Sequence, residues 1–556
     1  MTAVKLTRLL ELRRLRELKV AREAELQARR DAEARERREA EARERRKALR
    51  ERWPSPLDMG EELDPPRVDE NDERIGVWRT PALELINASL VDLAEGHERK
   101  IATFMPPQEG KSTITSYWFV LWLLVCVNPD LRILIVSYND SMARRWGSDL
   151  KNALERWSGA DGYVDLGLRL RKDSRAAGRW NIAGYRGQVY CAGLSGGGIT
   201  GKPGDVIIVD DPLKNMKEAQ SEKIRETALS AYQSVIVPRM GSPNAKLAWI
   251  QTLWHEAEPI QKIIANEGDQ TTGGRWKVTR IPAVAEEDND ILGRRRGEGM
   301  ISARGDKDWA QVRKDVGEYV FGALYQQRPS PAEGNLFKRI WWRYWSPGAG
   351  TRINLGPRTY DLRDCWRFAT VDLAASTKTS ADWTVISAWA RTINGDLVLL
   401  DRVRARIGEA EHFTHARSLV ERWKLDTVFV EATQHGLTLV REATNAGIPI
   451  TPLEAETDKV TRALPASAWC SNGRIWLPAG AWWTRLWVDE HAAFPTGRND
   501  DQVDTLSYAV RVSVTRPAPA LTPTATVTDV RQPGTGIGGR PDDGEEWIDW
   551  ETSNPL

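Results

Sequence analysis

The feature that most constrains this chain is a short apolar run followed by Pro-Pro-Gln-Glu-Gly-Lys-Ser and then by a longer apolar run. Residues 101–105 have the composition of a β-strand, and residues 117–127 that of a buried helix. In a phosphate-binding loop between two such elements, backbone N–H groups surround the β-phosphate, a lysine contacts the β- and γ-phosphates, and the next hydroxyl binds Mg²⁺. The segment predicted to bind a nucleotide consists of Gln108, Glu109, Gly110, Lys111, Ser112 and Thr113.

This loop departs from the usual pattern, because Met105 stands where a further glycine is expected, five residues before Gly110. Gly-Lys-Ser at the start of a helix is also compatible with ordinary capping. A second motif supports nucleotide binding: an apolar run at 206–209 ends in Asp210 and Asp211, where a P-loop fold places its second metal carboxylate. We assign Asp210 to Mg²⁺ through water and Asp211 to orienting or deprotonating the attacking water, against the alternative of an Asp-Asp-Pro turn.

Other residues of this half are candidates for roles around a nucleotide. Arg144 and Arg145 follow an apolar strand at 132–138, and either is a candidate arginine finger for a neighbouring subunit's γ-phosphate or a plain surface residue. Thr252 ends another apolar strand and is predicted to sense the γ-phosphate and pass its loss to a neighbouring domain. Lys202, in the glycine-rich loop from 193 to 204, is a candidate contact for phosphate or DNA.

Composition excludes several classes of protein. The 556 residues are enough for two to four domains with well-buried cores, and a net charge of +1 restricts any basic surface to local patches. The four cysteines are far apart, without zinc spacing or a disulfide framework, which indicates a reducing, intracellular setting. The longest apolar stretch, 117–127, is too short to span a bilayer, so we expect no membrane association.

Acidic residues in the C-terminal half follow strands in a recurring order. Three hairpin-connected strands are predicted at 368–371, 384–390 and 397–401, and the first ends at Asp372. A helix at 409–423 comes next, and a strand after it ends at Glu431. This order brings both acids together with Asp500, Asp501 and Asp504, which lie at the start of the last predicted helix, running through Tyr508.

Two divalent metal ions about 4 Å apart need several shared carboxylates to act on a phosphodiester. Asp372, Glu431 and Asp501 are the predicted catalytic ligands, and Asp500 or Asp504 shares the metal site or lies outside it. A single acid at a strand end is more often a turn residue, but three in this order favour a metal-dependent nuclease.

Residues 321–337 contain Phe-Gly-Ala-Leu-Tyr-Gln-Gln-Arg-Pro and then Gly-Asn-Leu-Phe. This succession resembles the hinge segment of the large terminase subunits, the DNA-packaging motors of tailed phages. The glycine-rich loop before Asp210-Asp211-Pro212 and the segment 252–256 are similar to that family's ATPase core. Many relatives carry Glu where this chain has Asp211, which leaves open which carboxylate activates water.

The resemblance covers roughly residues 78–515. It implies ATP hydrolysis that drives double-stranded DNA into a procapsid, and cutting of concatemeric DNA with Mg²⁺, for which Mn²⁺ can substitute at the nuclease site. The implied partners are the portal protein, the small terminase subunit and further copies in a homo-oligomeric ring, in the host cytoplasm and not in the mature virion. Asp458, Lys459 and Arg462 also resemble a family motif, whose cations face the DNA backbone or brace the acidic site.

The expected fold class is α/β. Residues 1–52 contain no Gly or Pro and form a helix, either solvated or contacting DNA or a partner. The predicted segments are a charged helical arm (1–53), a linker (54–77), a P-loop ATPase domain (78–325), a hinge (326–345), an RNase H-like endonuclease domain (346–515) and a disordered acidic tail (516–556), which in this family contacts the portal.

Two alternative functions remain at this point. One is a helicase-nuclease of DNA repair or restriction, although no strand-separating motif occurs between Thr252 and Phe321. The other is a non-catalytic DNA clamp with a degenerate P-loop, suggested by Met105.

Overall fold

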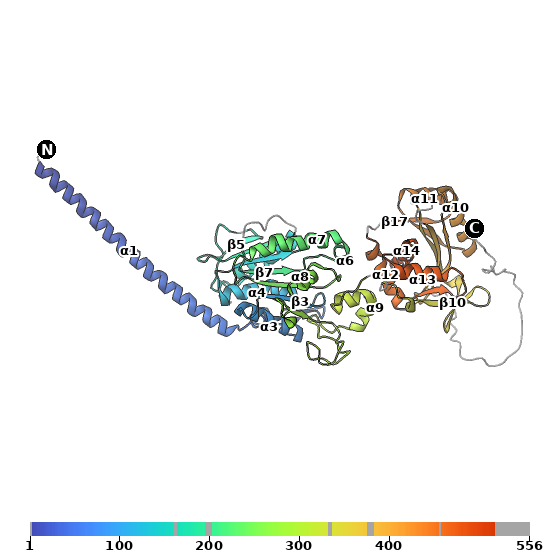
Figure 1. Cartoon of the computed structure of the whole chain (residues 1–556), viewed down its shortest axis with the longest axis horizontal. Coiled ribbons are helices and arrows are strands. Elements are labelled where there is room, and N and C mark those ends of the chain that lie inside the picture. The colour runs from blue at the N-terminus through green and yellow to red at the C-terminus, as the bar shows by residue number, and fades with distance from the viewer. Residues whose placement is uncertain are drawn as a thin grey trace.

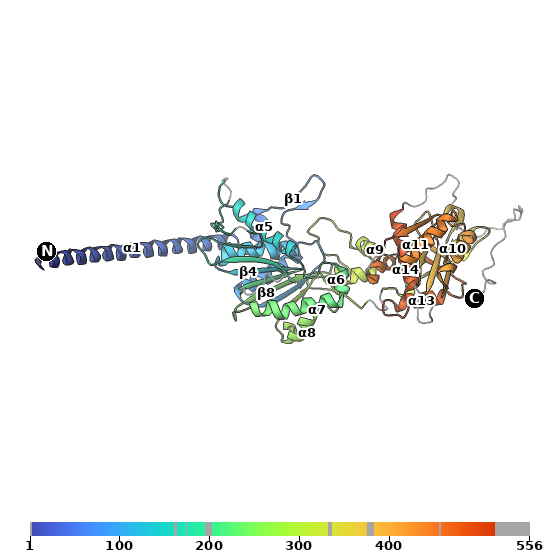
Figure 2. The ribbon, with the colours of Figure 1, turned by 90° about the horizontal axis from the view of Figure 1, so that it is seen from above.

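The chain forms a long helix and two α/β domains, which follow one another along the long axis in both views (Figures 1 and 2). The predicted α/β class is confirmed. Lys202 and residues 517–556 of the predicted tail lie outside the described residues. The computed structural model describes residues 3–160, 164–174, 176–194, 203–331, 336–374, 383–454 and 458–516.

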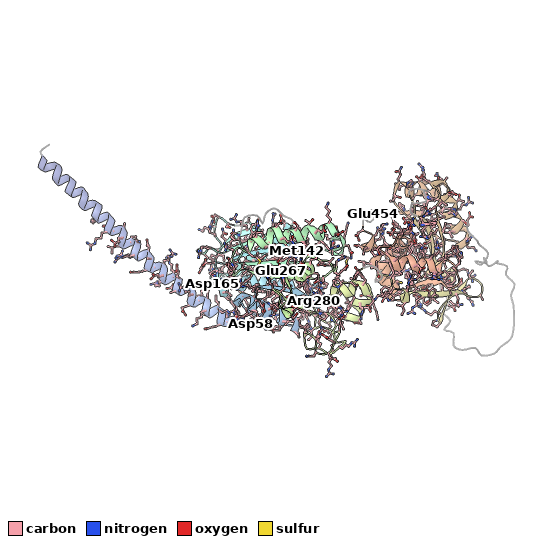
Figure 3. All side chains as sticks on the ribbon, in the orientation of Figure 1. Asp58, Met142, Asp165, Glu267, Arg280 and Glu454 are labelled. Carbon is pink, nitrogen blue, oxygen red and sulfur yellow. The ribbon has the colours of Figure 1, made fainter. Side chains whose placement is uncertain are left out.

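Helix α1 (Ala3–Arg52) projects from the first domain on the side away from the second (Figures 1 and 2). Every side chain from 22 to 41 is exposed, which agrees with a solvated helix. The helix is attached near its C-terminal end, where Arg50 lies 2.8 Å from Glu95 and Arg45 lies 3.1 Å from Asp165, labelled beside the base of the helix in Figure 3.

Residues 54–77, predicted to be a linker, are instead packed against the first domain. Ser55 caps helix α2 (Pro56–Leu63) by accepting a hydrogen bond from Asp58 N, and Pro56 occupies the first turn, where proline is well tolerated. Leu57 and Met59 are buried in the same core as Trp53. A two-stranded ribbon, β1 (Arg67–Val68) and β2 (Arg74–Ile75), follows. The proline and acidic residues therefore begin and cap a helix here, which outweighs their loop-like composition.

The first domain contains a seven-stranded sheet. From one edge to the other its strands are β5 (Arg179–Asn181), β6 (Gln188–Gly193), β4 (Arg132–Ser137), β7 (Val206–Asp210), β8 (Lys246–Gln251), β3 (Lys100–Phe104) and β9 (Lys277–Arg280). All pairings are parallel except that of β5. Because parallel strands end at the same edge, the residues that follow β3, β7 and β8 meet there.

Helices cover both faces of this sheet. Alternate strand residues enter two cores: Ile133 and Ile135 lie in one, Leu134 and Val136 in the other. Glu267 of α8, labelled in Figure 3, lies 2.5 Å from Lys100 of β3. The helices are α3 (Pro81–Glu95), α4 (Phe119–Trp122) within a helical run from 111 to 127, α5 (Asp140–Arg156), α6 (Met216–Gln220), α7 (Glu222–Ala231) and α8 (Pro259–Glu267).

The two domains meet at helices α9 (Trp309–Val320) and α12 (Lys459–Ser471). Gly317 interrupts α9 with φ +80°, and a Cβ there would lie 2.7 Å from the Cα of Ala468 on α12. The predicted hinge at 326–345 begins with two glutamines bound to the first domain. Gln326 Oε1 accepts from Val284 N at 3.0 Å, and Gln327 Oε1 accepts from Leu253 N at 3.1 Å.

The second domain contains a nine-stranded sheet with helices on both faces. Its strand order is β12 (Arg358–Asp361), β11 (Arg352–Leu355), β10 (Arg343–Pro347), β18 (Ile475–Pro478), β15 (Leu397–Ala405), β14 (Thr384–Arg391), β13 (Trp366–Asp372), β16 (Thr427–Glu431) and β17 (Ile450–Leu453). Its remaining helices are α10 (Glu409–Trp423), α11 (Gln434–Asn445), α13 (Thr484–Ala493) and α14 (Asp501–Thr515). Residues of α12, α13 and α14 share one core with β13, and residues of α10 and α11 share the core on the opposite face.

Candidate functional site

The predicted phosphate-binding loop connects β3 to the helical run that begins at Lys111. Gly110 has φ +89° and Gln108 has φ +65°, so the backbone turns sharply where a phosphate cradle requires it. Met105, in place of the usual glycine, has a fully buried side chain, and its carbonyl oxygen accepts from Thr252 Oγ1 at 3.1 Å. The missing glycine is thus replaced by a core residue that also holds the end of β8.

The predicted nucleotide-binding loop, the acidic pair and Thr252 converge at the carboxyl edge of the sheet. Lys111 Nζ donates to Thr252 Oγ1 at 2.8 Å and lies 3.7 Å from Asp211. Thr252 N donates to Asp211 Oδ1 at 3.0 Å. Ser112 Oγ donates to Asp210 Oδ1 at 2.7 Å. The loop, the acidic strand and the strand-end threonine therefore form one connected site.

Burial, together with the neighbouring charge of Asp211, raises the pKa of Asp210 to about 6 against the opposing hydrogen bonds from Ser112 and Ser116. Ser116, which the sequence analysis did not single out, donates to Asp210 Oδ2 at 2.8 Å. It lies one helical turn after Ser112, and that spacing was the available signal. The hydroxyl of Ser112 and the carboxylate of Asp210 provide the oxygen donors that Mg²⁺ prefers.

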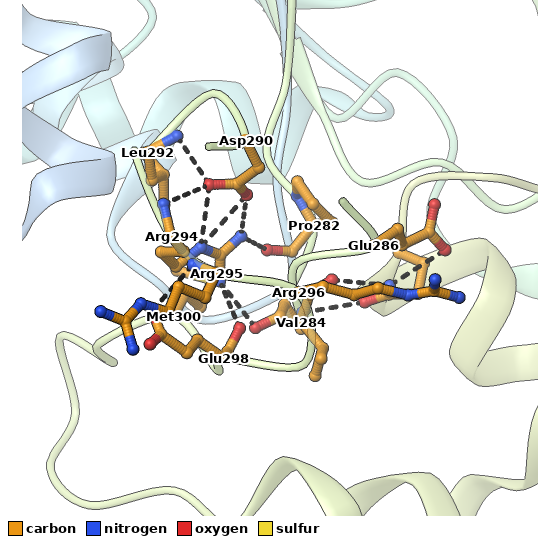
Figure 4. A network of polar contacts seen from close by, with 12 residues as sticks. Pro282, Val284, Glu286, Asp290, Leu292, Arg294, Arg295, Arg296, Glu298 and Met300 are labelled. Atoms are coloured by element: carbon orange, nitrogen blue, oxygen red, sulfur yellow. Dashed lines mark hydrogen bonds and ion pairs between the residues drawn. The ribbon is translucent and has the colours of Figure 1, made fainter. Parts of the chain in front are cut away.

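The side chain of Glu109 binds protein groups in this structure. It is buried and accepts from Ser302 Oγ at 3.2 Å, Ala303 N at 3.0 Å and Lys307 Nζ at 2.9 Å. These partners belong to the segment between β9 and α9, whose preceding part is held by Arg294 (Figure 4). Arg294 is 2.6 Å from Asp290 and donates to the carbonyls of Pro282 and Ala283.

Glu258 is a further buried acid beside the site that sequence reasoning missed. Its carboxylate accepts from Trp254 N at 2.5 Å, from His255 N at 2.9 Å and from Gln251 Nε2. Burial raises its pKa to about 7 against these hydrogen bonds. Glu258 thus has a structural role: it fixes the backbone directly after Thr252. The sequence signal for it was a glutamate immediately before Pro259, at the start of a helix.

The two candidate finger arginines lie on the exposed surface of α5. Arg144 is 3.3 Å from Asp140, and Arg145 is 3.8 Å from Asp149, each one turn away on the same helix. More than half of each arginine side chain is exposed.

In the second domain, Asp372 and Glu431 end neighbouring parallel strands, β13 and β16. Asp501 and Asp504 lie in the first turn of α14, which is fixed on the sheet because Thr505 accepts through its carbonyl from Thr370 Oγ1 at 2.8 Å. Burial, followed by the charges of Asp504, Asp501 and Glu431, raises the pKa of Asp372 well above its usual value. These four carboxylates form the acidic cluster.

Cations of α12 contact this cluster. Arg462 lies 2.5 Å from Asp504 and 3.9 Å from Glu431, and Lys459 lies 2.7 Å from Asp500. Of the two roles predicted for these cations, bracing the acidic site is the one observed here. Within the described ranges no three carboxylate, imidazole or thiol groups stand close enough to enclose a metal ion. The donors of the cluster are carboxylate oxygens, which suit Mg²⁺ or Mn²⁺.

Each domain matches a family model. Residues 104–343 match "Terminase large subunit, T4likevirus-type, N-terminal", and residues 369–511 match "Terminase RNaseH-like domain". The chain belongs to the large terminase subunits of tailed bacteriophages. The terminase N-terminal match contains Lys111, Asp210 and Thr252, and the nuclease match contains the whole acidic cluster.

Among solved structures, the large terminase of a thermophilic bacteriophage is 13% identical, with 76% of this chain and 98% of that chain covered and a TM-score of 0.42. The bacteriophage HK97 large terminase is 10% identical, with 76% and 94% covered and a TM-score of 0.32. The terminase nuclease of thermophilic phage G20c with bound magnesium is 18% identical, with 33% and 98% covered and a TM-score of 0.25. A search of curated proteins found no match to this terminase. In the described parts of the chain, no helix combines the length and apolar character needed to cross a membrane.

Proposed function

We propose that this chain is a viral DNA-packaging motor, which hydrolyses ATP to move double-stranded DNA into a procapsid and cuts concatemeric DNA by metal-dependent phosphodiester hydrolysis. The observation that carries the proposal is the presence of two separate sites on two sheets of one chain. One joins Lys111, Asp211 and Thr252, and the other is the acidic cluster around Asp372. A non-catalytic clamp would have no need of either arrangement.

In the ATPase site, Lys111 is placed to contact the β- and γ-phosphates of ATP. Ser112 and Asp210 would hold Mg²⁺, and a bound Mg²⁺ would neutralise negative charge on the phosphate oxygens. Asp211 orients the attacking water, because its carboxylate is fixed by Thr252 N. Loss of the γ-phosphate frees the Lys111 amine to rebind Thr252 Oγ1, as it does here at 2.8 Å.

The backbone after Thr252 leads directly to the domain junction. Leu253 N donates to Gln327, the second residue of the predicted hinge. A shift at Thr252 therefore reaches the hinge through one hydrogen bond, which gives the ATPase site a route to the nuclease domain.

In the nuclease site, Asp372, Glu431 and Asp501 would hold two divalent ions, which supply an activated water and stabilise the leaving oxygen when bound. Asp504 and Asp500 are outer carboxylates in this proposal, since each is bound to a cation of α12. Arg462 limits the repulsion among these acids before metal binds.

The partners follow from membership of the family and are proposals. They are the portal protein, contacted by the C-terminal tail, the small terminase subunit, and further copies in a ring on the portal. The location is the host cytoplasm during infection. In such a ring Arg144 or Arg145 acts on a neighbour's ATP, so mixing the alanine variant of either with Lys111→Ala protein should restore ATPase activity. Absence of rescue at every mixing ratio would exclude a finger in trans.

The experiment that tests the motor function measures ATP hydrolysis by the full chain with DNA and with empty procapsids. We expect procapsids to stimulate hydrolysis by the wild-type protein and not by Lys111→Ala. If the wild-type rate with both partners present stays at the Lys111→Ala background, the chain is a clamp and the proposal is wrong.

A further inference from the structure

Three arginines alternate along the end of β15 and directly after it: Arg402 and Arg404 lie in the strand, and Arg406 follows its last residue, Ala405. Side chains two residues apart on a strand point to the same face. That face is the one covered by α13 and α14, because Arg402 lies over the ring of Trp483 at 5.0 Å and Arg404 lies 2.8 Å from Glu490 on α13. The guanidinium groups of Arg402 and Arg404 therefore share the side of the sheet that carries the acidic cluster, and Arg406 packs on the same Trp383 ring as Arg404.

The strand register places these arginines beside the nuclease site. Asp372 pairs with Val385, and Val385 pairs with Arg404, so the two charged residues are level with each other across three strands. At about 4.8 Å between strands, their Cα atoms are roughly 10 Å apart. Directly paired residues in antiparallel strands also point to the same face.

Trp383 connects the arginines to the acidic cluster. Its backbone N–H donates to Asp501 Oδ1 at 3.3 Å. Its ring centroid lies 4.6 Å from Arg404 Cζ and 4.2 Å from Arg406 Cζ. One residue thus binds a predicted metal ligand through its backbone and packs against two guanidinium groups through its side chain.

The positive charge of Arg402, Arg404 and Arg406 is incompletely neutralised by the described residues. In the described ranges Arg404 pairs with Glu490, whereas Arg402 and Arg406 form no ion pair. The Nε donor of each of the three arginines is buried without a hydrogen-bond acceptor among the described residues. Burial and the adjacent Arg404 lower the pKa of Arg402 to about 10, as expected for crowded cations. An anion bound at the outer ends of these half-buried guanidinium groups would neutralise the remaining charge.

We propose that Arg402, Arg404 and Arg406 form a phosphate-binding subsite for the backbone of the DNA duplex that is cut at the acidic cluster. The inference rests on the proposed nuclease function and adds a named substrate contact to it. Planar guanidinium groups bind phosphate oxygens in pairs, and packing on an aromatic ring fixes their orientation. With about 3.4 Å of axial rise per nucleotide of one strand, a Cα separation of roughly 10 Å places the bound phosphate within a few nucleotides of the cut.

The test compares Arg406→Gln and the double variant Arg402→Gln/Arg406→Gln with wild type, as full chains. Binding of a labelled duplex is measured by fluorescence anisotropy in EDTA, which prevents cleavage, over a range of salt concentrations. Each lost phosphate contact lowers the slope of log affinity against log salt by about 0.9, which is about fivefold weaker binding at 0.15 M salt. The double variant should lose about twice that slope.

Arg406→Lys keeps the charge and should retain the wild-type slope. Arg417→Gln, on the exposed surface of α10 where Arg417 pairs with Glu421, is the matched control and should bind as wild type. In Mg²⁺ or Mn²⁺, Arg406→Gln should raise the KM for DNA cleavage and leave kcat near the wild-type value.

Two failures are distinguishable. If the wild-type chain cuts no DNA with either metal ion, the proposed nuclease function is wrong. If the wild-type chain cuts DNA but the double variant binds with the wild-type affinity and salt slope, the phosphate-binding subsite is wrong.

Discussion

Arg462 provides the sharpest test of how the acidic cluster is held before metal binds. Its side chain is 6% exposed and lies 2.5 Å from Asp504, which is 8% exposed, and 3.9 Å from Glu431, which is 19% exposed. Its guanidinium also packs over the ring of Tyr508 at 5.3 Å. Replacing it with glutamine would leave several carboxylates facing one another without their buried counter-charge.

Removing one partner of a buried ion pair costs about 3–5 kcal/mol. We take the lower end, about 3 kcal/mol, since Asp504 can become neutral: burial raises its pKa against the effect of Arg462. In a domain of roughly 150–250 residues each kcal/mol shifts the Tm by about 2–4 °C. Arg462→Gln should therefore lower the Tm of the nuclease domain by about 6–12 °C in EDTA. Added Mg²⁺ supplies positive charge to the same carboxylates, so it should stabilise the variant more than the wild type.

The assay is calorimetry of the full chain, with the nuclease transition identified as the one that ADP does not shift. Arg417→Gln, which removes an exposed pair with Glu421, is the control and should leave the Tm unchanged. A Tm for Arg462→Gln within one or two degrees of wild type in EDTA would refute the reasoning. So would an equal effect of Mg²⁺ on both proteins.

Three further changes have defined outcomes. Gly317→Val forces a branched side chain into φ +80° against Ala468 and should loosen the domain junction, seen as faster proteolysis between the domains; unchanged proteolysis would contradict this. Burial lowers the pKa of His491 to about 3, below an unfolded value of about 6.5, so stability falls as pH drops from about 6.5 because the unfolded state binds the proton. Between pH 6.5 and pH 4, the free energy of unfolding of His491→Phe should fall by about 3 kcal/mol less than that of the wild type. Plots of unfolding free energy against pH that run parallel for the two proteins would refute this. Thr252→Val removes the hydroxyl that binds Lys111 and should slow ATP hydrolysis about 100-fold with ATP affinity retained; wild-type turnover would exclude its role.

Elements fixed by local pattern were predictable from the sequence. Helix α10 was predicted at its observed bounds, 409–423, and the strands ending at Asp210, Asp372 and Glu431 were placed correctly. Each of these strands is a short apolar run with a polar end, and its position depends little on distant residues. The order of such strands was enough to bring the site carboxylates to a common edge in each domain.

What could not be predicted depends on contacts between residues far apart in the chain. Strand β18 (Ile475–Pro478) lies between β10 and β15, although it comes after both in sequence, and it ends in proline. In the sequence Glu109 is one polar residue of a loop. Its carboxylate, however, accepts hydrogen bonds from Ser302 and Lys307, almost 200 positions later. Trp53 and residues 54–77 were assigned to an arm and a linker, because burial against α3 and α4 leaves no local signature.

The central claim is that one chain contains two independent hydrolytic sites. The most direct measurement assays ATP hydrolysis and metal-dependent plasmid cleavage on the same full-length preparations of wild type, Lys111→Ala and Asp372→Asn. We predict that Lys111→Ala loses ATP hydrolysis but nicks plasmid at the wild-type rate without ATP. Asp372→Asn should hydrolyse ATP normally and cut DNA about 10²- to 10⁴-fold more slowly. Near-normal cleavage by a folded Asp372→Asn protein, or loss of both activities from either single change, would contradict the account.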